Sequence, residues 1–142
     1  MKALFVAGGK GSRLQPLTDK LPKPMVPIMN KPLLERTMVH LKRSGISSIV
    51  ISNCYQSNTI ETYFGDGKEF GLQIEYIVED LPLGTGGAIR KAGAQFKETF
   101  ITFISDIVSD IDIQRLIDYH KAKKHFHYCS NGGSGSFFIR CH

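Results

Sequence analysis

The sequence predicts an α/β domain in which helices cover both faces of a mostly parallel β-sheet. Short apolar runs of strand length alternate four times with segments of helical periodicity, and this alternation is typical of parallel sheets. Glycine or polar residues directly follow the apolar runs, at the place where ligands bind such sheets. The 142 residues correspond to one domain.

The first half of the pattern contains two strands and two helices. The apolar run at 2–7 is the first strand. Residues 30–32 mark the start of the next helix, because proline is tolerated at an early helical position, and residues 44–45 mark its end. The second strand is then 46–52, and the second helix is 53–64.

The second half repeats the alternation. Residues 72–78 alternate apolar and polar side chains, as a third strand does. A third helix follows over 85–96, with Thr85 expected as its N-cap. The apolar run at 100–105 is the fourth strand, and 112–124 is the fourth helix.

A glycine-rich and cationic stretch follows the first strand and reads AGGKGSRLQPLTDKLPKPMVP over residues 7–27. Gly8, Gly9 and Gly11 allow left-handed backbone and leave N–H groups free to approach an anion. An ordinary tight turn also contains such glycines. The cations that follow favour a phosphate site.

Two cations in this stretch suit phosphate oxygens. Arg13 offers a planar fork of donors, and Lys23 offers a point charge. Pro22 and Pro24 flank Lys23 and are expected to hold it on a stiff, extended segment. We therefore expect Arg13 and Lys23 to contact phosphate rather than to be solvated surface charges.

The stretch contains neither the P-loop pattern nor the dinucleotide pattern. GGxGxRLxPLT followed by PKPMVP resembles the signature of the sugar-1-phosphate nucleotidyltransferases, which make nucleoside-diphosphate sugars. The resemblance implies a Rossmann-like three-layer α/β/α fold. It also implies that Ala7 joins the glycines, Arg13 and Lys23 in binding the nucleotide.

Three polar residues follow the later strands, namely Asn53, Glu79 and Asp106. We interpret Asn53 as a strand-end turn residue or a helix N-cap. Glu79 can accept hydrogen bonds from a base edge, and Asp106 can ligate a divalent cation. The run FISD that ends at Asp106 resembles the family's strand in which an aspartate holds Mg²⁺, with Ser105 as a small departure.

A second glycine cluster, EDLPLGTGGA, occupies residues 79–88. Gly84, Thr85 and Gly86 belong to a loop that can approach a flat base closely. The run LGTGGA is most similar to the mannose-1-phosphate guanylyltransferase branch of the family. Because guanine presents N1–H and an amino group as a donor pair, a carboxylate at Glu79 favours GTP, with UTP and dTTP as alternatives.

The resemblance implies a displacement at the α-phosphorus of a nucleoside triphosphate by a phosphate oxygen of a sugar 1-phosphate, which releases pyrophosphate. Catalysis then depends on positioning and on charge neutralisation. In this scheme Asp106 binds Mg²⁺, Arg13 holds the departing pyrophosphate, and Lys23 offsets charge on the α-phosphate and the sugar phosphate.

The composition limits the kinds of binding partner and the cellular location that we expect. The net charge of +5 and the pI near 9.2 are compatible with a nucleic-acid-binding module. The cations are spread, however, and aromatic residues do not interleave with them, so a small anionic substrate is the better explanation. No apolar run has the length of a membrane span, and three irregularly spaced cysteines argue against a disulfide framework. We expect a cytoplasmic protein with no nucleic-acid or membrane partner.

The resemblance covers residues 1–124, and residues 125–142 differ in character. Family members continue with a sugar-binding Glu-Lys-Pro segment and a second metal-binding aspartate, neither of which this chain contains. We therefore divide the chain at 124, with a truncated nucleotide-binding part before it and a tail changed by truncation or a reading-frame shift after it. A non-catalytic nucleotide-binding remnant is accordingly the alternative to an active enzyme.

The tail raises two further expectations. Its side chains His125, His127 and Cys129 would share one face of a strand, and Cys141 and His142 could add soft ligands, although the spacing matches no familiar zinc motif. A sheet that stops at the fourth strand would also leave an exposed edge, through which two copies of the chain could pair as a homo-oligomer.

Overall fold

A five-stranded sheet forms the centre of the computed structural model, which describes residues 1–9, 11–54, 57–79, 81, 83–105 and 111–123 and the backbone of 137–140. The strands are β1 (Lys2–Val6), β4 (Ser48–Asn53), β5 (Gln73–Val78), β6 (Phe100–Ile104) and β7 (Phe137–Arg140). Their order across the sheet is β5-β4-β1-β6-β7. All neighbouring pairs are parallel except β6 with β7. The predicted mostly parallel sheet is confirmed.

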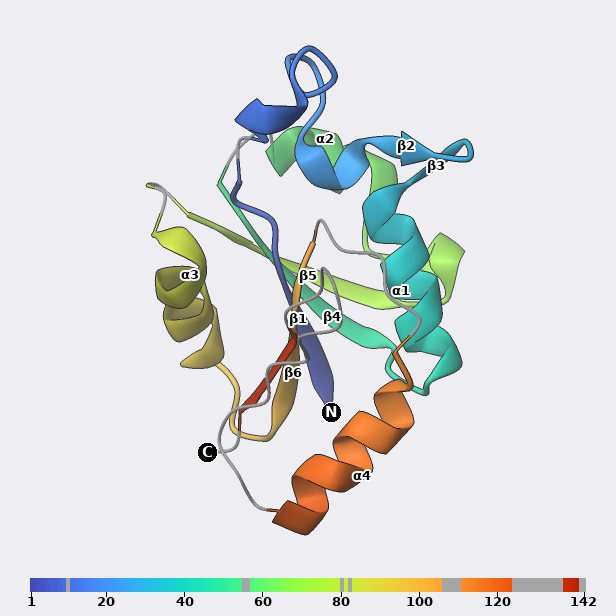
Figure 1. Cartoon of the computed structure of the whole chain (residues 1–142), viewed down its shortest axis with the longest axis vertical. Helices are drawn as coiled ribbons and strands as arrows, with labels where there is room; N and C mark the ends of the chain where they lie inside the picture. The colour runs from blue at the N-terminus through green and yellow to red at the C-terminus, as the bar shows by residue number, and fades with distance from the viewer. Residues whose placement is uncertain are drawn as a thin grey trace.

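Helices cover both faces of the sheet, as predicted. Figure 1 shows α3 (Gly84–Gly93) on one side and α1 (Leu33–Arg43) and α4 (Ile113–Lys123) on the other. The remaining helix, α2 (Ser57–Phe64), packs into the same apolar cluster as α1 and α4. The result is a three-layer α/β/α arrangement. None of the described helices combines the length and the apolar character needed to cross a bilayer.

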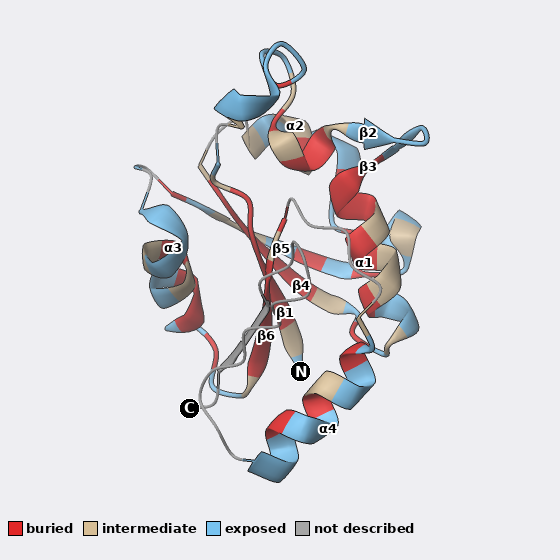
Figure 2. Cartoon of the chain, in the orientation of Figure 1, coloured by how far each residue is buried: buried red, intermediate tan, exposed pale blue. Residues whose placement is uncertain are grey.

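Alternation along the strands builds the two apolar layers. Phe5 of β1 and Phe103 of β6 point toward α1 and α4, and their rings stack with centroids 5.5 Å apart. Leu4 and Phe100 point to the opposite face and pack near α3. The central strands β1, β4 and β6 are buried along most of their length (Figure 2). Each fully buried side chain of this size contributes about 1.5–3 kcal/mol of transfer free energy, so these layers hold the sheet edge in place.

A small hairpin precedes α1 where the sequence predicted the start of the helix itself. Its strands β2 (Pro27–Ile28) and β3 (Lys31–Pro32) are antiparallel. The two loop residues, Met29 and Asn30, have φ angles of 49° and 63°. Positive φ at both positions is the requirement of a two-residue hairpin turn whose twist matches its strands. The prediction missed the hairpin because the usual Asn-Gly signal is absent and two of its four strand residues are proline.

The tail contributes a strand that the sequence analysis did not predict. The backbone of 137–140 pairs with β6, with Phe100 opposite Arg140 and Phe103 opposite Phe137. The expectation that β6 would form an open edge is therefore wrong, because β7 occupies it. A homo-oligomer remains a prediction, but an open edge at β6 no longer supports it.

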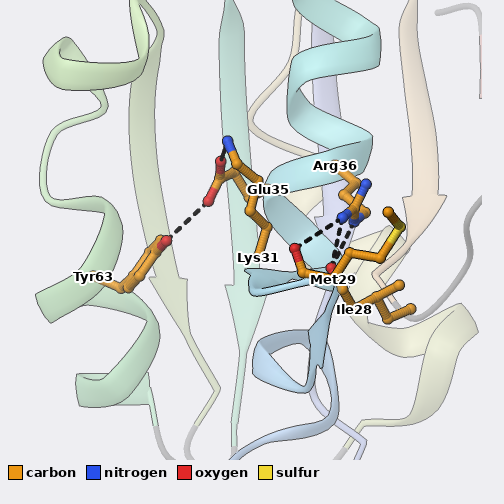
Figure 3. A network of polar contacts seen from close by, with 6 residues as sticks. All are labelled: Ile28, Met29, Lys31, Glu35, Arg36 and Tyr63. Carbon is orange, nitrogen blue, oxygen red and sulfur yellow. Dashed lines mark hydrogen bonds and ion pairs between the residues drawn. The ribbon is translucent and has the colours of Figure 1, made fainter.

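A polar network fastens the hairpin to two helices (Figure 3). Glu35 of α1 accepts a hydrogen bond from Lys31 Nζ at 2.7 Å and one from the Tyr63 hydroxyl of α2 at 2.8 Å. Arg36 donates to the carbonyl oxygen of Ile28, with its Nη2 atom at 2.6 Å. Burial by itself raises the pKa of Glu35, but the hydrogen bonds from Lys31 and Tyr63 and the nearby charges outweigh it, so that the pKa is lowered.

We predict that Glu35→Gln destabilises the fold by about 1–3 kcal/mol at neutral pH, because a buried acceptor loses its charge and its ion pair. A lowered pKa means that this stabilisation is present above the ordinary pKa of 4.5 and is lost as the pH falls through the folded-state value. Urea unfolding of both proteins should therefore show a difference at neutral pH that shrinks below about pH 4.5. A difference of equal size at acidic pH would contradict the ionic role of Glu35.

Candidate functional site

A cavity of about 450 Å³ opens at the carboxyl edge of the sheet, beside the ends of β1, β5 and β6. It is lined by Val6, Ala7, Gly8, Gly9, Lys23, Pro24, Glu79, Leu83, Gly84, Thr85, Ala88, Ile104 and Ser105. The two glycine-rich segments, far apart in the sequence, meet in this one cavity. Gly11, Arg13 and Gly86 were predicted as site residues but do not line it.

The first glycine segment presents unused backbone donors to the cavity. The Ala7 N–H donates to the Ser52 carbonyl at 2.7 Å and so continues the pairing of β1 with β4. In the described part of the chain, the N–H groups of Gly8 and Gly9 donate to no other group. Free N–H groups at a strand end can bind an anion.

Gly11 packs behind the lysine of the cavity. Its φ angle is 65°, and its carbonyl accepts a hydrogen bond from the buried hydroxyl of Thr18 at 2.8 Å. A Cβ at this position would lie 2.9 Å from Thr18 Cγ2 and 3.1 Å from Lys23 Cβ. Gly11 and Thr18 therefore fix the loop against Lys23. Thr18 was not predicted as a site residue, although it belongs to the signature stretch.

Lys23 lines the cavity as predicted, but its backbone is not extended. It opens a 3-10 turn, η2 (Lys23–Met25), in which the Val26 N–H donates to the Lys23 carbonyl at 3.2 Å. Pro22 alone has the expected extended conformation. Pro24 and Met25 are buried and anchor the turn, so the lysine is positioned by packing rather than by a stiff extended segment.

Arg13 lies away from this group. It belongs to the short 3-10 turn η1 (Ser12–Leu14), which has no buried residue, and it is exposed. The structure thus brings Lys23, but not Arg13, to the cavity. The contact of Arg13 with phosphate stays a prediction.

Glu79 is the acidic residue among the described residues that line the cavity, and it is only 4% exposed. Ser52 Oγ donates to Glu79 Oε1 at 2.6 Å, and the Leu83 N–H donates to Oε2 at 3.4 Å. A Cβ on Gly8 would lie 4.0 Å from Oε2. The carboxylate therefore sits where the two glycine segments and β4 converge. The sequence analysis missed Ser52, whose only signal is a small polar residue at the end of an apolar run.

The amino end of α3 supplies further donors to the cavity. The helix begins at Gly84, Leu83 occupies the N-cap position, and no side chain caps it within the described residues. The prediction that Thr85 caps this helix is wrong, because Gly84, with a φ of 68°, already starts the first turn. The first N–H groups of a helix have no partner within the helix. Gly84 and Thr85 carry such groups and line the cavity.

Asp106, the predicted Mg²⁺ ligand, lies outside the described residues. Its neighbour Ser105 is held at the cavity, because its N–H and its Oγ both donate to the Val6 carbonyl, at 3.2 and 2.8 Å. No three histidine, cysteine, aspartate or glutamate side chains gather within the described ranges. The soft ligands considered in the tail (His125, His127, Cys129, Cys141 and His142) also lie outside the described residues.

Asn53 ends β4 and does not cap α2, which begins at Ser57. It is fully buried, and neither atom of its amide has a hydrogen-bond partner among the described residues. The strand-end interpretation is confirmed and the N-cap interpretation is wrong. The structure assigns no role to its unpaired amide.

Comparison with known proteins decides the family. The profile described as nucleotidyl transferase matches residues 2–131. This chain belongs to the nucleotidyl transferase family. The match continues past the boundary predicted at residue 124, and the division of the chain at that point stays a prediction.

Two curated proteins and one solved structure are similar to this chain. The chain is 40% identical over 86% of its length to mannose-1-phosphate guanylyltransferase of Mycobacterium tuberculosis and covers 34% of that protein. It is 36% identical over 87% of its length to UTP--glucose-1-phosphate uridylyltransferase of Synechocystis and covers 35% of it. The structure of HddC from Yersinia pseudotuberculosis complexed with GMP-PN superposes with a TM-score of 0.76 and 25% identity, over 99% of this chain and 73% of that one. The chain therefore spans about a third of the two curated relatives.

We predict that Gly11→Ala destabilises the fold more than Gly45→Ala. Both glycines have positive φ, and an alanine there costs about 1–2 kcal/mol. A Cβ at Gly45 meets no atom within 4 Å, whereas one at Gly11 meets Thr18 and Lys23. Chemical denaturation of the two variants should show the larger loss for Gly11→Ala. Equal losses would show that Gly11 does not fix the loop against Lys23.

Proposed function

We propose that this chain is the nucleotide-binding part of a sugar-1-phosphate nucleotidyltransferase. The enzyme joins a nucleoside triphosphate and a sugar 1-phosphate to give a nucleoside-diphosphate sugar and pyrophosphate. The observation that supports this function best is the convergence in one cavity of Lys23, Glu79 and the N–H groups of Gly8 and Gly9, which have no partner among the described residues. The activities named for the similar proteins agree with it.

The phosphate half of the cavity suits the proposed chemistry. An oxygen of the sugar phosphate attacks the α-phosphorus, and the bond from that phosphorus to the oxygen of the β-phosphate breaks, with its electron pair leaving on pyrophosphate. Such a transfer needs alignment and charge neutralisation more than covalent help. Lys23 supplies positive charge to the same cavity as the N–H donors of Gly8 and Gly9. A Mg²⁺ held by Asp106 would add Lewis-acid charge stabilisation when bound.

The other half of the cavity suits guanine. The guanine edge presents two adjacent donors, N1–H and the amino group, next to the O6 acceptor. Glu79 offers carboxylate oxygens to the donors, and the N–H groups of Gly84 and Thr85 at the start of α3 offer donors to the acceptor. A uracil or thymine edge has one N–H between two carbonyl oxygens, which a carboxylate repels. We therefore propose GTP as the preferred triphosphate, with a sugar 1-phosphate as the second substrate.

One experiment separates the proposed enzyme from two alternatives, a non-catalytic nucleotide-binding remnant and a nucleic-acid-binding module. Pyrophosphate release is measured with Mg²⁺, each common nucleoside triphosphate, and mannose 1-phosphate or glucose 1-phosphate, alongside titration with the triphosphate alone. Release that requires both substrates supports the proposed enzyme. Triphosphate binding without release supports a non-catalytic remnant. Absence of triphosphate binding, or salt-dependent binding to DNA or RNA in its place, contradicts the proposed function.

We predict that Lys23→Ala lowers turnover at least about 100-fold, as the loss of one electrostatic contact to a transition state does. Lys20→Ala is the matched control, because Lys20 is an exposed lysine of the same loop outside the cavity lining. Rates are compared by pyrophosphate release, and thermal unfolding confirms that both variants fold. A near-normal rate for Lys23→Ala would remove Lys23 from the mechanism.

A further inference from the structure

We infer that Ser52 is a positioning residue that sets the base selectivity of the cavity by fixing the carboxylate of Glu79. This inference rests on the proposed function, because it assigns a role within the same nucleotide site. Ser52 does not line the cavity, and it would act on the base only through Glu79.

Ser52 is well placed for this role by the topology of the sheet. In register it lies between Val6 of β1 and Ile77 of β5. It is completely buried, and its Oγ donates to Glu79 Oε1 at 2.6 Å. β4 therefore anchors a carboxylate that follows β5 and holds it beside Gly8, which follows β1.

The carboxylate of Glu79 can accept more hydrogen bonds than the protein supplies to it. An ionised carboxylate offers about four lone-pair positions. The Ser52 hydroxyl occupies one on Oε1, and the Leu83 N–H approaches one on Oε2 at the long distance of 3.4 Å. Each oxygen then keeps one position for a ligand. A pair of positions on neighbouring oxygens fits the donor pair of guanine.

Removal of the hydroxyl would disturb this pattern without disturbing the sheet. The Ser52 carbonyl already accepts the Ala7 N–H at 2.7 Å, so the backbone pairing does not need the side chain. With alanine at this position, Oε1 becomes a buried acceptor with no protein donor. The carboxylate is then free to rotate toward the Leu83 N–H, and its two oxygens no longer present a fixed pair to the base.

The test compares dissociation constants for GTP and UTP, measured by titration calorimetry on the parent chain and on Ser52→Ala. The ratio of the two constants is the readout, because a lower folded fraction affects both nucleotides equally and leaves the ratio unchanged. Thr102→Val is the matched control. Thr102 also carries a buried hydroxyl, on β6, and that hydroxyl has no hydrogen-bond partner among the described residues.

Ser52→Ala is expected to lower the preference for GTP over UTP about tenfold, mainly through weaker GTP binding. Thr102→Val is expected to keep the parent ratio. In a Glu79→Gln background, where the carboxylate is absent, Ser52→Ala should no longer change the ratio by more than about twofold.

Two results would overturn the inference. One is a Ser52→Ala ratio equal to that of the parent. The other is a tenfold change that persists in the Glu79→Gln background, because Ser52 would then act by another route. Failure of the proposed function is a separate outcome, since the parent chain itself would then bind neither nucleotide.

Discussion

The cavity depends on the hydrogen bonds that the buried carboxylate of Glu79 receives. It receives the Ser52 hydroxyl from β4 and the Leu83 N–H from the segment before α3, and it lies beside Gly8 at the end of β1. A buried carboxylate is costly unless donors surround it. These donors come from separate parts of the chain, so folding must bring those parts together before the charge is compensated. The same convergence leaves an acidic group in the wall of the cavity.

The parallel sheet makes this convergence possible. β1, β4, β5 and β6 all end at one edge, and apolar layers on both faces fix where each strand ends. Close packing then adds precision. Gly11 has no room for a Cβ between Thr18 and Lys23, and buried Pro24 and Met25 anchor the turn that carries Lys23. Lys23 and Glu79 are thus both held in fixed places at the wall of the cavity.

Much of this arrangement could be predicted from the sequence, because periodicity and strand-end residues are local signals. The four parallel strands, their helices, Gly8, Gly9 and Glu79 follow from such signals. Lys23 was predicted from its charge between two prolines and from the family resemblance, and Ala7 from the resemblance alone. Tertiary contacts were less accessible. The hydroxyl of Ser52 and the packing of Thr18 depend on partners distant in sequence or hidden in a loop. The hairpin before α1 lacks its usual turn residues, and β7 is defined by its pairing with β6 rather than by a pattern of its own.

A crystal structure of this chain with a non-hydrolysable GTP analogue tests the account most directly. The account predicts guanine with its N1–H and amino group within hydrogen-bond distance of Glu79, and the triphosphate along Gly8 and Gly9 toward Lys23. The carboxylate should keep its hydrogen bond to Ser52 in the complex. Guanine bound away from Glu79, or a triphosphate bound outside this cavity, would contradict the central claim.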